Sequence, residues 1–108
     1  MKINLEGGVL EITPNALKKI VYLATLESYG AVGIGTQSFF EKIFGGEKGI
    51  KVEEDEDSTI NVDLYIEVEY GVNIREVARN IIDNVTHKLR TLANCEKVKV
   101  NVHVVGIR

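Results

Sequence analysis

The fold is decided by residues 60–92, which read INVDLYIEVEYGVNIREVARNIIDNVTHKLRTL. From Ile60 to Tyr70 the even positions are apolar, and the odd positions, apart from Tyr65, are polar or charged. A period of two is typical of a strand with one buried side and one side facing water. We therefore predict a strand over Ile60–Tyr70, whose even-numbered side chains enter the core.

An amphipathic helix is expected directly after this strand. Gly71 permits a turn, and Asn73 followed by Glu76 has the spacing of a helix capping box. Beyond the cap, apolar residues recur at helical spacing. The predicted inner stripe consists of Ile74, Val77, Ala78, Ile81, Ile82, Val85, Leu89 and Leu92.

The remaining elements complete a single α+β domain over residues 1–108. Thr13-Pro14 predicts a helix start, with the helix ending near Glu27 or Ser28. Three further strands are expected, at Leu5–Ile12 with Gly7-Gly8 as a turn or bulge within it, at Ile50–Glu56, and at Lys97–Ile107. The order βαββαβ predicts a two-layer fold, in which a four-stranded sheet carries both helices on one face. A split βαβ arrangement of the ferredoxin-like kind fits this order, and the order of the strands stays open.

Composition favours a soluble cytoplasmic protein that does not bind nucleic acid. The formal net charge is -3, whereas phosphate recognition needs a concentrated basic surface. Cys95 is the only cysteine, which suits a reducing compartment. The first residues lack a secretion signal, and no apolar run is long enough to span a bilayer. We expect any contact with the membrane to be peripheral and to pass through a partner protein.

No catalytic, cofactor-binding or metal-binding constellation is evident, so we do not expect an enzyme. His87 and His103 are far apart in sequence and fall on polar faces, which favours solvated surface histidines. Cys95 is expected to pack against the end of the second helix, because nothing in the sequence places a base beside it. The acidic run at residues 53–57 lacks the spacing of a calcium-binding loop and is interpreted as a solvated hairpin turn.

The most individual segment is a phenylalanine cluster between glycines. All three phenylalanines of the chain fall within it. The candidate interaction surface is Phe39, Phe40, Ile43 and Phe44. Two interpretations stay open: the rings complete a small core beneath the sheet edge, or they form an exposed apolar patch for self-association or for a protein partner.

The sequence resembles the alkaline shock, or envelope stress response, protein family over nearly its whole length. The resemblance rests on Gly8-Val-Leu-Glu-Ile-Thr, Ala31-Val-Gly, Gly49-Ile-Lys-Val-Glu, Val62-Asp-Leu-Tyr-Ile-Glu-Val-Glu-Tyr-Gly-Val-Asn-Ile, Val77-Ala and Val98-Lys-Val-Asn-Val-His-Val-Val-Gly-Ile. It implies a small bacterial cytoplasmic protein without known catalytic residues, linked to stress at the cell envelope. Some members associate with the membrane through a separate anchor protein, and others neighbour a kinase-like protein.

Two hypotheses follow for the function. The first is a non-enzymatic scaffold in cell-envelope stress or homeostasis that forms homo-oligomers or binds a protein partner. The second is an accessory domain that binds an acyl or phosphate metabolite and works with a kinase-like enzyme. This alternative predicts a partly apolar pocket between the helices and the glycine-rich segment.

Overall fold

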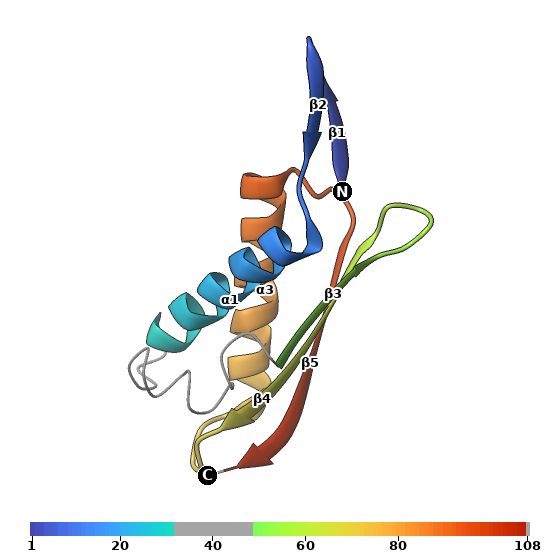
Figure 1. The fold of residues 1–108 in the computed structure, drawn as a ribbon. Helices are drawn as coiled ribbons and strands as arrows, with labels where there is room; N and C mark the ends of the chain where they lie inside the picture. The colour runs from blue at the N-terminus through green and yellow to red at the C-terminus, as the bar shows by residue number, and fades with distance from the viewer. Residues whose placement is uncertain (32–48, 108) are drawn as a thin grey trace.

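The computed structural model describes residues 1–31 and 49–107, without the side chains of residues 29–31. Its described part is an α+β fold with two helices and with sheets of two and three strands (Figure 1). The elements are β1 (Lys2–Leu5), β2 (Gly8–Glu11), α1 (Pro14–Ala31), β3 (Ile50–Glu54), β4 (Ile60–Val68), α3 (Ile74–Ala93) and β5 (Val98–Ile107). The α+β class and the positions of both helices are therefore confirmed.

The prediction of one four-stranded sheet is wrong, because the first strand does not join the others. Gly7 has a φ of 87°, in the left-handed region that glycine adopts without strain, and it folds the segment back on itself. The result is an antiparallel hairpin in which Ile3 lies opposite Leu10. This hairpin stands beyond the end of the main sheet (Figure 1).

The main sheet has the order β3-β4-β5. β3 pairs with β4 antiparallel as the predicted hairpin, with Val52 opposite Val62. β5 pairs with β4 in parallel, with Val62 opposite Val100 and a bulge after Ile66. Since β4 and β5 are direct neighbours joined through α3, this half of the chain is an unsplit βαβ unit. The ferredoxin-like arrangement is therefore also wrong, because it would place another strand between them.

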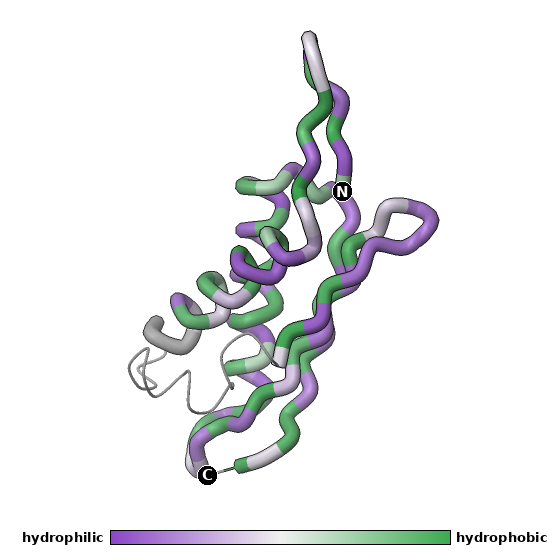
Figure 2. The backbone as a smooth tube through the Cα atoms, viewed as in Figure 1, coloured by the Kyte–Doolittle hydropathy of each residue, from purple (hydrophilic) through white to green (hydrophobic). Residues whose placement is uncertain are grey.

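Both helices cover the same face of the main sheet (Figure 1). The even-numbered residues of β4 are buried beneath them, as the period-two pattern predicts. Figure 2 shows the alternation of apolar and polar residues along these strands. The centre of the core consists of Leu17, Val21, Ile60, Val62, Leu64, Ile66, Val68, Ile81, Val85 and Leu89.

The helix starts follow their sequence signals. The Asn73 side chain accepts a hydrogen bond from the Glu76 backbone N–H at 3.1 Å, so the predicted cap of α3 is confirmed. The Thr13 hydroxyl likewise accepts from the Ala16 N–H at 3.2 Å. α1 continues to Ala31, which is beyond its predicted end.

The buried stripe of α3 is narrower than predicted. Its buried residues are Val77, Ile81, Val85, Leu89 and Ala93. Leu92 and Ile74 are exposed, because the three described strands of the main sheet do not extend beneath the sides of the helix. The two helices are joined by a hydrogen bond of 2.8 Å from the Asn84 side-chain amide to the Ala24 carbonyl.

Candidate interaction surfaces

The predicted interaction surface lies outside the described residues. Phe39, Phe40, Ile43 and Phe44 all fall within residues 32–48. The prediction that they form a working surface therefore stays a prediction. The same holds for the pocket expected between the helices and the glycine-rich segment, because that segment falls largely in the same range.

One polar cluster lies on the face of the main sheet that faces away from the helices. The His103 ring nitrogen Nε2 is 2.9 Å from the Asp63 carboxylate, and the Asn101 side-chain amide donates to the same oxygen at 3.3 Å. The Tyr65 ring stacks on the His103 ring, with centroids 4.6 Å apart and planes 13° apart. Hydrogen bonds from His103 and Asn101 lower the pKa of Asp63.

This cluster revises the interpretation of His103. The residue is partly exposed, as expected, but it is a partnered residue and not a freely solvated one. The sequence could not show this contact, since Asp63 and His103 come together only because β5 lies parallel to β4 in this register. A carboxylate–imidazole pair can serve general base catalysis, which needs substrate held beside it. Here the pair lies on an open sheet face, where its evident effect is to fix β5 against β4.

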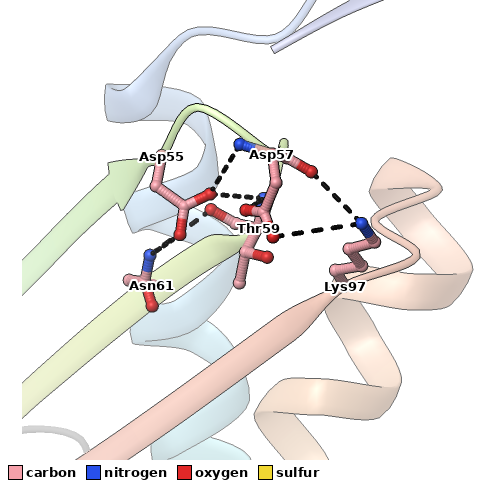
Figure 3. A network of polar contacts seen from close by, with 5 residues as sticks. All are labelled: Asp55, Asp57, Thr59, Asn61 and Lys97. Atoms are coloured by element: carbon pink, nitrogen blue, oxygen red, sulfur yellow. Dashed lines mark hydrogen bonds and ion pairs between the residues drawn. The ribbon is translucent and has the colours of Figure 1, made fainter.

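The acidic turn between β3 and β4 uses its carboxylates internally (Figure 3). Asp55 accepts hydrogen bonds from the backbone N–H groups of Asp57 and Thr59 and from the side-chain amide of Asn61. The Lys97 ammonium lies 4.0 Å from the Asp57 carboxylate. Hydrogen bonds with Asp57 and Asn61 lower the pKa of Asp55. In the described part of the chain, no group of three or more His, Cys, Asp or Glu side chains could hold a metal ion.

Cys95 packs beyond the end of α3, as predicted. Asn94 forms the C-terminal cap of α3 in the left-handed conformation, with a φ of 56°, and Cys95 follows it directly. The Cys95 sulfur lies 3.5 Å from the Met1 sulfur, and the side chain is buried. Burial raises the pKa of its thiol, and the nearby Glu54 charge acts in the same direction. This cysteine is therefore a poor nucleophile.

Two apolar surfaces remain uncovered by the described residues. The first is one side of the β1–β2 hairpin, where Leu5 is 57% exposed and Leu10 is 42% exposed. The second is a groove between α3 and β5. It is lined by Ile74, Arg75, Ala78, Arg79, Ile82, Val102 and Val104.

The sequence analysis missed the groove because it assigned Ile74, Ala78 and Ile82 to the core. A signal was present, since these residues recur at every fourth position and Arg75 and Arg79 follow them at the same spacing. Neighbouring rows of apolar and basic residues mark the border of a buried stripe. The position of that border depends on how much sheet lies beneath the helix.

These features define a class of protein: a small α+β domain with a helix-covered three-stranded sheet, a projecting hairpin and uncovered apolar surfaces. The family model that matches residues 2–108 is that of the alkaline shock protein 23 family, described as having a cell envelope-related function. The chain belongs to this family. The resemblance found in the sequence is thus confirmed.

Several relatives of similar length match the chain. An uncharacterised protein of Streptococcus pyogenes serotype M6 is 31% identical, over 100% of this chain and 94% of its own length. The uncharacterised proteins YqhY and YloU of Bacillus subtilis are 31% and 26% identical, over 94% and 100% of this chain and 78% and 95% of their own lengths. No solved structure matches at a significant level. No helix in the described residues is long and apolar enough to cross a membrane.

Proposed function

We propose that this protein is a non-enzymatic scaffold in cell-envelope homeostasis that associates with copies of itself or with a protein partner. The family membership supports the link to the cell envelope. The observation that carries the interaction role is the hairpin of β1 and β2. Contact with the membrane then passes through a partner, and nucleic acid is not a ligand.

The hairpin presents an apolar side that its own domain leaves largely uncovered. Antiparallel pairing sets Ile3 opposite Leu10, and Leu5 lies on the same side as both. The other side carries the ion pair between Lys2 and Glu11, whose charged atoms are 3.9 Å apart. An isolated two-stranded hairpin is only marginally stable in water, and burial of its apolar side against another surface stabilises it.

The base of the hairpin is anchored, so the projecting part is held in one direction. The Met1 ammonium donates to the Ile12 carbonyl at 3.0 Å and lies 3.4 Å from the Glu54 carboxylate. The Ile12 N–H donates to the Met1 carbonyl at 2.8 Å. A rigid apolar projection loses less conformational entropy on binding than a flexible arm does, which favours association.

The exposed polar side of the main sheet supports the exclusion of nucleic acid. It carries the carboxylates of Asp63 and Glu53. The Lys51 ammonium lies 3.4 Å from the Glu53 carboxylate. A sheet that binds RNA needs unpaired basic groups and stacking aromatic rings on this face. Tyr65 is already stacked on His103.

Light scattering coupled to size-exclusion chromatography tests the self-association. We expect the mass of the native chain to exceed that of a monomer and to rise with concentration, because the hairpin side becomes buried. Leu5→Ser with Leu10→Ser should return the protein to a monomer. Leu23→Ser is the matched control, since Leu23 is an equally apolar residue, 49% exposed, on α1.

If the native chain stays monomeric at high concentration, the proposed self-association is contradicted. In that case the apolar side of the hairpin is expected to bind a different protein. Affinity capture from the native cell tests this partner binding. Capture of the same proteins by the native chain and by the Leu5→Ser, Leu10→Ser variant would contradict a role for the hairpin. A Phe39→Ser, Phe44→Ser variant in the same experiment tests the phenylalanine surface separately.

A further inference from the structure

The groove between α3 and β5 combines an apolar floor with a basic rim. Its floor is formed by Ile74, Ala78 and Ile82 from the helix and by Val102 and Val104 from the strand. Ile74 is 39% exposed, so the floor is open to solvent at the start of the helix. Arg75 and Arg79 form the rim.

The two rim arginines have no ionic partner among the described residues. By contrast, the ammonium groups of Lys88 and Lys97 lie within 4.0 Å of the carboxylates of Glu27 and Asp57. Arg75 and Arg79 lie one helical turn apart, where like charges repel each other. The charged residues that line the groove are therefore both positive, in a chain whose net charge is -3.

The strand at the side of the groove has an unpaired edge in the described structure. β5 is the last strand in the order β3-β4-β5, and its described hydrogen-bonding partner is β4 alone. It is also the longest of the described strands, from Val98 to Ile107. A long edge strand offers a row of backbone N–H and C=O groups to an added strand.

We propose that this groove binds an extended acidic segment of a partner protein as an additional strand on β5. Successive side chains of such a strand would alternate between the two faces of the sheet. Those on the helix side would place apolar groups on Ile74, Ala78 and Ile82 and carboxylates beside Arg75 and Arg79. The inference rests on the proposed interaction role but concerns a different surface from the hairpin.

The charges around the groove favour this occupant over two others. The acidic turn of a second copy is a poor occupant, because the Asp55 carboxylate already accepts from Asn61 and the Asp57 carboxylate already lies 4.0 Å from the Lys97 ammonium (Figure 3). An anionic membrane is recognised by clusters of several cations, whereas this groove is lined by only two arginines. A strand gains backbone hydrogen bonds that a lipid headgroup cannot supply to β5.

A designed peptide tests the proposal without knowledge of the natural partner. The peptide is acetyl-Thr-Val-Thr-Glu-Thr-Val-Thr-Glu-Thr-amide, in which valine and glutamate share one side of a strand. It is titrated into the 15N-labelled Leu5→Ser, Leu10→Ser variant while amide chemical shifts are followed. Use of this variant separates the groove from self-association through the hairpin. The expected result is a saturable shift of amides along β5 and in the first half of α3.

Three comparisons test whether binding depends on ion pairs between the rim arginines and the peptide glutamates. Arg75→Gln and Arg79→Gln should each weaken the binding about two- to fivefold, the range of an exposed ion pair, and Arg90→Gln at the other end of α3 should not. The peptide with both glutamates replaced by glutamine should bind more weakly by about the product of the two arginine effects, because it loses both ion pairs. Added salt should reduce the difference between the two peptides.

The proposal is overturned if the acidic peptide shifts no amides of β5, or if the glutamine peptide binds equally well. It is also overturned if vesicles of phosphatidylcholine with phosphatidylglycerol bind the protein through Arg75 and Arg79 while the peptide does not. Because the titration uses the hairpin variant, a failure here leaves the proposed scaffold role intact. A failure of self-association likewise leaves this titration interpretable.

Discussion

Strand β4 of the main sheet and strand β1 of the hairpin have the same apolar–polar alternation but different surroundings. In β4 every second side chain is buried under α1 and α3. In β1 and β2 the corresponding apolar side chains remain mostly exposed, because no element of the described chain covers them. The comparison teaches that period two indicates only that a strand has an apolar side. What covers that side depends on the rest of the fold or on another molecule.

The largest effect is expected in the covered sheet. Ile66→Asp should unfold the domain, because Ile66 is 1% exposed and a buried carboxylate without a partner costs several kcal/mol, against a total stability of roughly 5–15 kcal/mol. Circular dichroism would show loss of the cooperative thermal transition. Ile66→Val is the control and should retain the fold. An unchanged melting temperature in Ile66→Asp would contradict the assignment of the buried side.

A smaller effect is expected at the helix that covers this sheet. Asn73→Ala removes the side-chain acceptor of the Glu76 N–H and should lower the free energy of unfolding by about 1 kcal/mol. Asn73→Asp retains an acceptor and should restore most of the loss. Urea denaturation monitored by circular dichroism measures both variants. Equal stability of Asn73→Ala and the native chain would show that the cap does not limit the stability of α3.

The outer side of the same sheet should respond to pH. The folded state lowers the pKa of Asp63, so this carboxylate contributes stability that is present above its ordinary pKa and is lost as pH falls through the lowered value. Asp63→Asn should therefore be less stable than the native chain at neutral pH. Its deficit should shrink as the solution is acidified to below the lowered pKa of Asp63. Thermal melts of both proteins over an acidic pH series measure this difference.

Asp63→Asn has a matched control in Asp83→Asn. Asp83 lies exposed on α3, and no ion pair links it to the other described residues. Its replacement should change stability much less at neutral pH. A deficit of Asp63→Asn that stays constant from neutral to acidic pH would contradict the role of the lowered pKa.

Local features of the fold were predictable from the sequence because they depend on neighbouring residues. The alternation over residues 60–68, the Asn73 cap and the Thr13-Pro14 helix start all act within a few positions. The four-stranded sheet was wrong because Gly7-Gly8 is compatible with both a bulge and a complete turn. Whether the strand pairs with the main sheet or folds back on itself depends on contacts between residues distant along the chain.

The candidate surfaces were less predictable for the same reason. Asp63 meets His103 only through the parallel register of β4 and β5, which the sequence left open. The groove beside Arg79 exists because β5 is the outer strand of the described main sheet and leaves Ile82 partly exposed. Each depends on strand order, which is set by contacts between residues distant along the chain. The phenylalanine surface remains a prediction.

The smallest effect on stability is expected in the uncovered hairpin. Leu5→Ser with Leu10→Ser should change the free energy of unfolding of the monomer by no more than about 0.5 kcal/mol for each residue, because exposed positions lose little burial. Urea denaturation at a dilution where the native chain is monomeric measures this change. A loss of several kcal/mol would mean that the hairpin packs on its own domain in solution. A change this small, together with the loss of self-association, would show that the apolar side of the hairpin serves another molecule and not the fold.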